Sequence, residues 1–168
     1  MNLCLNILGI LCILMLAGLV MVCVISFIEN RRLQVNRYHI QDSHIPESFN
    51  GFRIVQLTDM HNTSFGKGNA RLLERVSGLS PDIIVITGDM LVGRPGTDVV
   101  LAADTMNALC EIAPVYFSMG NHELRISRYP DKYGDMWERF LKQLSPEVCC
   151  LFDRYTMVKN GDSHIYLY

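Results

Sequence analysis

The sequence predicts an α/β fold that follows a transmembrane helix. Three short apolar runs have the composition of buried strands, at residues 52–57, 83–86 and 115–117. Apolar residues at helical spacing follow these runs, at residues 69–79, 98–112 and 136–144. Strands that alternate with helices are typical of a parallel sheet with its ligand site at the carboxyl ends of the strands. The expected order is therefore β-α-β-α-β-α.

An uncharged apolar run of 26 residues, from position 3 to position 28, opens the chain. As a helix it would be about 39 Å long, enough to cross a hydrocarbon core of about 30 Å. A cleaved secretory signal is the alternative. The run lacks a basic segment before it, is longer than such signals and is not followed by a small-residue cleavage site. We therefore expect residues 1–28 to be a retained single-pass anchor.

The anchor's orientation is predicted from the charges that flank it. Arg31, Arg32 and Arg37 follow the apolar run, and no lysine or arginine precedes it. The positive-inside rule then places the globular part in the cytoplasm. Glu29 weakens this pattern, so an extracytoplasmic domain is the open alternative.

Residues 29–50 are predicted to form the exit from the membrane, with a weakly alternating first strand at 35–40 and then a loop. Residues 51–168 form the predicted globular domain, which is long enough for one hydrophobic core. Thr97 is a candidate cap for the helix at 98–112. Near the end of the chain, residues 155–159 and 163–168 flank Asn160-Gly161, the pattern of a β-hairpin.

Composition excludes several classes of function. The 15 basic and 17 acidic residues form no basic stripe, so we expect no nucleic-acid partner. Three of the six cysteines lie in the apolar run, and Cys110, Cys149 and Cys150 form no C-x-x-C pair. A disulfide framework or a cysteine zinc site is therefore not expected.

Polar motifs follow each of the three central strands: Thr58-Asp59-Met60-His61, Thr87-Gly88-Asp89-Met90 and Met119-Gly120-Asn121-His122-Glu123. Each motif alone is compatible with an ordinary turn or helix cap. Their repetition after three buried strands favours one shared site, because the carboxyl ends of parallel strands meet at one edge of a sheet.

The side chains in these motifs are those of a metal site without thiolates. Asp59 and His61 can enter one coordination sphere from a single loop, Asp89 can bridge two cations, and Asn121 offers a neutral amide oxygen. Nitrogen and oxygen ligands of this kind suit Mn²⁺, iron or Zn²⁺. Two such ions, about 3.5–4 Å apart, can hold a phosphoryl group and generate a hydroxide nucleophile.

Together the motifs resemble the calcineurin-like metallophosphoesterase family. The N-terminal apolar segment, followed by the run from Phe52 to His61, is similar to its bacterial membrane-associated, phosphodiesterase-like branch. The resemblance covers roughly residues 35–168 and includes the spacings of 28 residues from His61 to Asp89 and 32 residues from Asp89 to Asn121.

The resemblance implies a role for each motif residue. Asp59 and His61 would bind the first metal, Asp89 would bridge both metals, and Asn121 would bind the second. His122 would be catalytic, beside the phosphate, where it stabilises the transition state or protonates the leaving oxygen.

The sequence departs from the family pattern after residue 123. Family members carry a later histidine and a Gly-His-x-His segment, whereas the other histidines here are His39, His44 and His164. The first metal would keep three ligands and the second only two. We therefore expect residues 51–168 to be the first half of the family's α/β sandwich, with the C-terminal half missing.

Two functional hypotheses follow. The first is a metal-dependent phosphoester hydrolase of phosphodiesterase or pyrophosphatase type, with two divalent ions, a bridging hydroxide and a phosphorylated small-molecule or lipid-linked substrate. The second is a membrane-anchored protein that keeps half of the fold without catalysis, or a fragment of a longer product.

Overall fold

The computed structural model describes residues 2–29 and 32–168 and divides into two compact units, Met1–Tyr38 and His39–Tyr168. The first unit contains the helix α1 (Asn2–Glu29), which is long and apolar enough over Asn6–Glu29 to cross a membrane. Arg31, one of the three arginines behind the predicted orientation, lies outside the described residues. Residues 35–40 do not form the expected strand. A segment this short is stable as a strand only when a neighbouring strand pairs with it. No strand in the described part of the chain pairs with residues 35–40.

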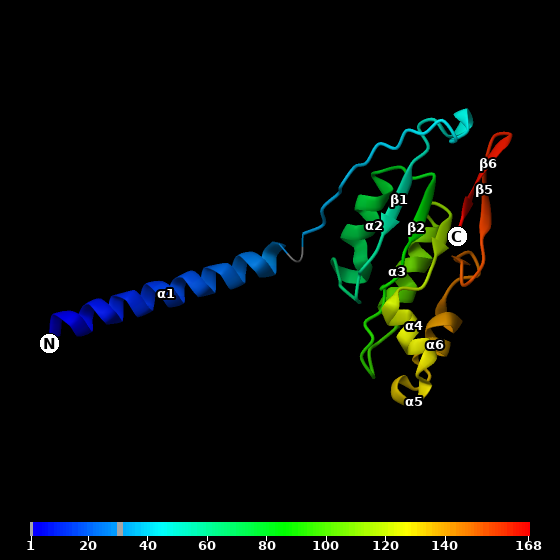
Figure 1. Ribbon diagram of the computed structural model, residues 1–168. Helices are drawn as coiled ribbons and strands as arrows, with labels where there is room; N and C mark the ends of the chain where they lie inside the picture. The colour runs from blue at the N-terminus through cyan, green and yellow to red at the C-terminus, as the bar shows by residue number, and fades with distance from the viewer. Residues whose placement is uncertain (1, 30–31) are drawn as a thin grey trace. The chain divides into compact units, whose positions relative to one another are not determined.

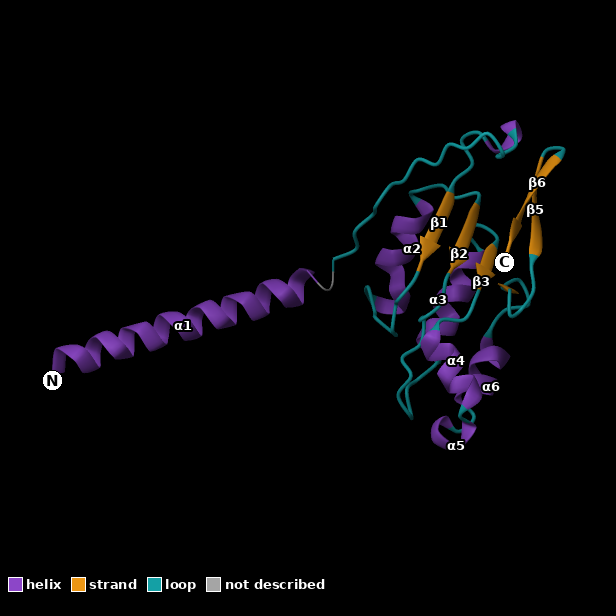
Figure 2. Ribbon diagram, viewed as in Figure 1, coloured by secondary structure: helices purple, strands orange, loops and turns teal. Residues whose placement is uncertain are grey.

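A four-stranded parallel sheet forms the centre of the second unit (Figures 1 and 2). Its strands are β1 (Ile54–Leu57), β2 (Ile83–Ile86), β3 (Val115–Phe117) and β4 (Cys149–Cys150), in that spatial order. Leu57 pairs with Ile86, and Ile86 pairs with Phe117, so the first three strands end side by side. This register places the three polar motifs at one edge of the sheet, as expected.

The helices of the second unit are α2 (Ala70–Ser77), α3 (Val100–Cys110), α4 (Asn121–Arg128), α5 (Pro130–Tyr133) and α6 (Met136–Gln143), with short 3-10 turns at Glu47–Phe49 and Lys67–Asn69. The sequence predicted α2, α3 and α6, and these predictions are confirmed. The expected cap at Thr97 is wrong. The residue before α3 is Val99, and the carboxylate of Asp98 accepts the Val100 N–H at 3.0 Å instead.

The two faces of the sheet have different covers. On one face Phe117 is fully buried and packs against Phe140 of α6, with ring centroids 6.0 Å apart. On the other face, Ile83 packs with Phe49 and with Val158 of a two-stranded hairpin. A continuous apolar strand such as β2 is typical of sheets with helices on both faces. Among the described residues, the hairpin instead packs on the face that carries Ile83.

The hairpin consists of β5 (Thr156–Asn160) and β6 (Ser163–Leu167). Asn160 pairs with Ser163, so the turn residues are Gly161 and Asp162, one position later than the predicted Asn160-Gly161 turn. Gly161 has a φ of 57°, a conformation that glycine adopts without a steric penalty. The parallel sheet, the helices and the preceding apolar helix confirm the predicted α/β class and are consistent with the first half of a metallophosphoesterase fold.

Candidate metal site

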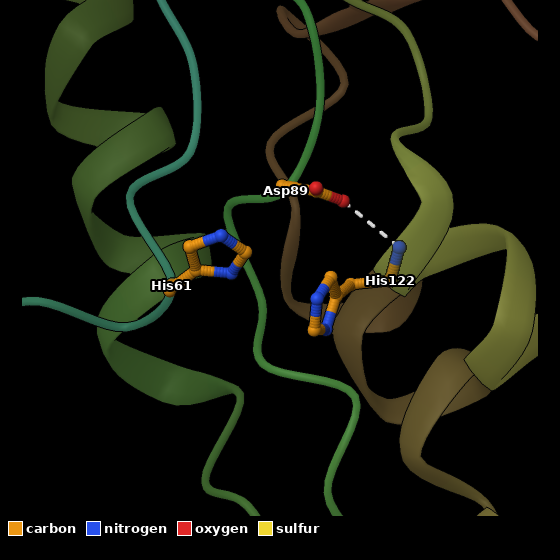
Figure 3. Close-up of side chains that lie close together, drawn as sticks. All are labelled: His61, Asp89 and His122. Atoms are coloured by element: carbon orange, nitrogen blue, oxygen red, sulfur yellow. Dashed lines mark hydrogen bonds between the residues drawn. The ribbon is translucent and has the colours of Figure 1, made fainter.

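Three loops at the carboxyl ends of β1, β2 and β3 bring His61, Asp89 and His122 together (Figure 3). Each side chain offers one ligand atom, and these atoms lie within 4.8 Å of one another. The His61 and His122 rings meet edge to face, with centroids 4.6 Å apart. Residues 61 positions apart in the sequence therefore form one cluster because parallel strands end at the same edge.

Backbone hydrogen bonds join the first two loops. The His61 N–H donates to the Asp89 carbonyl at 2.8 Å, and the Asp59 N–H donates to the Gly88 carbonyl at 3.2 Å. Asp59, His61 and Asp89 all have left-handed backbones, with φ values of 55°, 45° and 53°. Such conformations cost about 1–3 kcal/mol each in non-glycine residues and persist only where the surroundings hold them. The loops are thus strained and tightly bound to each other.

Two glycines allow the second and third loops to touch. Gly88 has a φ of 98°, and a Cβ atom added there would collide with the backbone of Gly120. A Cβ added at Gly120 would in turn collide with the carboxylate of Asp89. The motif glycines are therefore required by close backbone approach.

Glu123 holds these two loops in place. Its side chain is 0% exposed, and its carboxylate accepts the N–H groups of Asp89 at 2.7 Å, Leu91 at 2.8 Å and Gly120 at 3.0 Å. Hydrogen bonds to a charged acceptor are among the strongest in proteins. This role of Glu123 is not among those predicted from the sequence. The available signal was its place at the third position of α4, where a glutamate commonly bonds back to the helix start.

The Asp89 side chain is nearly buried, and its Oδ1 atom accepts the His122 backbone N–H at 2.8 Å. This bond connects the β2 loop to the first turn of α4, and Figure 3 shows the Asp89 carboxylate pointing to the His122 backbone nitrogen.

The His61 ring has a buried Nδ1 atom with no hydrogen-bond partner in the described part of the chain. Leaving a buried polar atom unpaired costs about 1–3 kcal/mol. The other ring nitrogen lies 3.5 Å from an oxygen of Asp59. None of the ion pairs among the described residues joins Asp59 or Asp89 to a lysine or arginine. An unpartnered imidazole nitrogen beside uncompensated carboxylates fits a divalent cation.

The remaining predicted ligands lie at the margin of this cluster. The Asp59 side chain is 63% exposed, and the Thr58 hydroxyl donates to it at 2.9 Å. Asn121 is exposed at the first position of α4. Their roles as ligands stay predictions. His122, predicted to act on the substrate, lies among the candidate ligand atoms.

Comparison with known proteins identifies the family of this chain. The sequence pattern of the calcineurin-like phosphoesterase family matches residues 52–167. A Danio rerio protein named "Transmembrane protein with metallophosphoesterase domain" is 35% identical over 81 residues, which are 47% of this chain and 18% of that protein. The "Uncharacterized metallophosphoesterase YkuE" of Bacillus subtilis is 30% identical over 67 residues, 39% of this chain and 23% of that protein. No solved structure matches the chain.

These alignments span only about a fifth of each relative's length, 18% and 23%. The family match, in contrast, covers most of the 168 residues and includes all three strand-end loops. The chain belongs to the calcineurin-like phosphoesterase family, whose members are hydrolases of phosphoester bonds.

Proposed function

We propose that this protein is a metal-dependent phosphoester hydrolase attached to a membrane by α1. The observation that carries the proposal is the cluster of His61, Asp89 and His122, in which a buried imidazole nitrogen has no partner among the described residues. The family match supports hydrolysis of a phosphoester as the reaction of such a site.

The cations would be held mainly by His61 and Asp89. Asp59, which contacts the His61 ring, is the proposed third ligand of one ion, and Asn121 is proposed to bind a second. Nitrogen and oxygen ligands favour Mn²⁺, iron or Zn²⁺. When bound, two such ions supply a hydroxide nucleophile at neutral pH and neutralise charge on the phosphoryl group.

The protein's own groups have two tasks in this scheme. Glu123 and the backbone bonds between the loops hold Asp89 and His61 in position, so the site is formed before substrate arrives. His122 extends beside the same cluster and is proposed to contact the phosphoryl group directly. Charge stabilisation by groups that are already oriented is usually a large part of an enzyme's effect on rate.

The proposed location is a membrane. The apolar helix α1 and the relative named as a transmembrane protein both support anchoring. We propose a cytoplasmic domain, from the arginines after α1. An anchor raises the local concentration of membrane-bound molecules, so a phosphodiester or pyrophosphate that is lipid-linked or formed near the membrane is the proposed substrate class.

Hydrolysis of bis-p-nitrophenyl phosphate tests the proposed function. The full chain is purified in detergent and assayed with Mn²⁺ beside Asp89→Ala and the matched control Asp104→Ala, which changes an exposed aspartate on α3. We expect metal-dependent release of p-nitrophenol by wild type and control, and loss of it in Asp89→Ala. Equal rates in all three would favour the non-catalytic alternative.

Orientation is tested separately, by protease digestion of spheroplasts that express the chain. A cytoplasmic domain stays intact until the membrane is opened, whereas digestion of intact spheroplasts would place it outside.

A further inference from the structure

The side chain of Asn62, in the loop after β1, bonds to both ends of another loop. Its carboxamide oxygen accepts the Val92 N–H at 3.2 Å, and its NH₂ group donates to the Asp98 carbonyl. The Asn62 backbone N–H also donates to the Met90 carbonyl, at 2.9 Å. The loop of residues 92–98, which leads toward α3, is therefore closed by one residue of the β1 loop.

A carboxamide suits both of these partners. A backbone N–H can only donate and a carbonyl can only accept, so a side chain that bonds to both needs one acceptor and one donor. An ionised aspartate has no donor, and alanine and glycine have neither group. Asn62 also has a left-handed backbone, with a φ of 56°, which asparagine adopts more readily than most residues. The residue type and the backbone conformation both fit a connection between two loops.

The loop that Asn62 closes contacts the candidate metal site through Gly93. The Gly93 N–H donates to His122 Nδ1 at 2.6 Å, and a Cβ atom added at Gly93 would lie only 3.0 Å from the same nitrogen. The hydroxyl of the buried Tyr133, in α5, donates to the Gly93 carbonyl at 3.3 Å. Because Asn62 bonds to the residue directly before Gly93, it determines how closely this backbone approaches the His122 ring.

The main proposed metal ligands are held independently of this loop. The His61 N–H bonds to the Asp89 carbonyl, and the Asp89 N–H bonds to the carboxylate of Glu123. Loss of the Asn62 side chain should therefore loosen residues 92–98 without removing a ligand of the cation.

We propose that Asn62 is a positioning residue, which closes the loop of residues 92–98 at both ends and so holds Gly93 against the His122 ring. The inference rests on the proposed function and deepens it, because it adds a residue that binds neither the cation nor the substrate. Removal of this side chain should change the opening of one loop and the rate of hydrolysis, but not the affinity for Mn²⁺.

Hydrogen exchange of the full chain in detergent without metal, read by mass spectrometry, tests the closure of the loop. Asn62→Gly removes both side-chain bonds and tolerates the left-handed backbone, whereas Asn62→Ala removes the same bonds and strains that backbone. We expect both variants to exchange the amides of residues 92–98 about 5- to 150-fold faster than wild type, the effect of two hydrogen bonds. Asn50→Gly, at an exposed asparagine before β1, is the matched control and should exchange this loop as wild type does.

The amides of β2 provide the reference for unfolding of the whole domain. They should stay protected over the times in which residues 92–98 exchange. Exchange of the loop and of β2 at a single rate would show that Asn62 acts on the domain as a whole, and would overturn the proposal. Unchanged loop exchange in Asn62→Gly would overturn it as well, because the side-chain bonds would then not hold the loop.

Kinetics and Mn²⁺ binding test the consequence for the site. With bis-p-nitrophenyl phosphate we expect Asn62→Gly to lose about 10- to 100-fold in kcat, because a displacement of about 1 Å in a site can cost that much. The affinity for Mn²⁺, read from the electron paramagnetic resonance of the free ion, should stay that of wild type. An unchanged kcat, or a fall in Mn²⁺ affinity as large as the fall in kcat, would contradict the proposal. If wild type shows no Mn²⁺-dependent hydrolysis, the proposed function fails, and the exchange measurement still decides whether Asn62 holds the loop.

Discussion

Replacing Glu123 by glutamine tests what holds the loops after β2 and β3 together. The Glu123 Oε2 atom accepts the N–H groups of Asp89 and Gly120, and Oε1 accepts that of Leu91. Glutamine has one acceptor oxygen and one NH₂ group. Whichever way it turns, its NH₂ group faces at least one backbone N–H, and at 0% exposure water cannot take the place of the lost acceptor.

The expected loss of unfolding free energy in Glu123→Gln follows from these three bonds. In the better orientation two bonds survive but lose their charge assistance, at about 1 kcal/mol each, and the third N–H is left unpaired at about 1–3 kcal/mol. The sum is about 3–5 kcal/mol. Relief of the desolvation of a buried charge lowers the net loss of unfolding free energy to about 2–4 kcal/mol. The free energy of unfolding of a typical domain is only about 5–15 kcal/mol.

The assay is urea unfolding of the full chain in detergent, followed by the fluorescence of the single tryptophan, Trp137. For a loss of this size the midpoint should fall by about 1–2 M. Glu138→Gln changes an exposed glutamate on α6 and serves as the matched control, with an expected effect within about 0.5 kcal/mol. If Glu123→Gln and the control unfold at the same urea concentration, the carboxylate does not hold the loops and the reasoning is refuted.

Three further outcomes are expected. Gly88→Ala should melt at a lower temperature than Gly96→Ala, because both have positive φ but only the former places a Cβ against neighbouring backbone; equal melting temperatures would refute the close approach. Phe140→Ala removes a ring that is 0% exposed and packs on Phe117, and should cost about 3–5 kcal/mol in urea unfolding, whereas a cost under about 1 kcal/mol would contradict the packing. Burial, with a contribution from the adjacent thiol, raises the pKa of Cys150, so iodoacetamide at pH 8 should alkylate it more slowly than it alkylates glutathione, as read by mass spectrometry.

The strands β2 and β3 and the helices α2, α3 and α6 were predictable because each buries an apolar run or stripe. The strand β1 was predictable from its apolar, β-branched composition, but it is not a buried strand, since its residues are half-buried or exposed. The helix α4 was not predicted, since its sequence is mostly polar and Ile126 is its one fully buried apolar side chain. It forms where Glu123 bonds back to the start of the helix. The strand β4 has two residues, Cys149 and Cys150, which is too short for any periodicity to appear.

The meeting of His61, Asp89 and His122 was predictable from topology alone, because parallel strands end at one edge. The bond from the Gly120 N–H to Glu123 has a signal in the sequence, the place of Glu123 in the first turn of α4, but the bonds from Asp89 and Leu91 do not. Their backbone N–H groups point to Glu123 because of the path of the folded loop, which leaves no pattern in side-chain identity. The exposure of Asp59 also depends on a left-handed backbone that its sequence position does not reveal.

Binding of Mn²⁺ to the full chain tests the central claim most directly, that the three strand-end loops form a divalent cation site. Titration of the detergent-solubilised chain, followed by the loss of the free Mn²⁺ electron paramagnetic resonance signal, reports binding without requiring turnover. We predict at least one bound ion per wild-type chain, loss of binding in Asp89→Ala and His61→Ala, and unchanged binding in Asp104→Ala. Equal binding in wild type and Asp89→Ala, or no binding in either, would contradict the account.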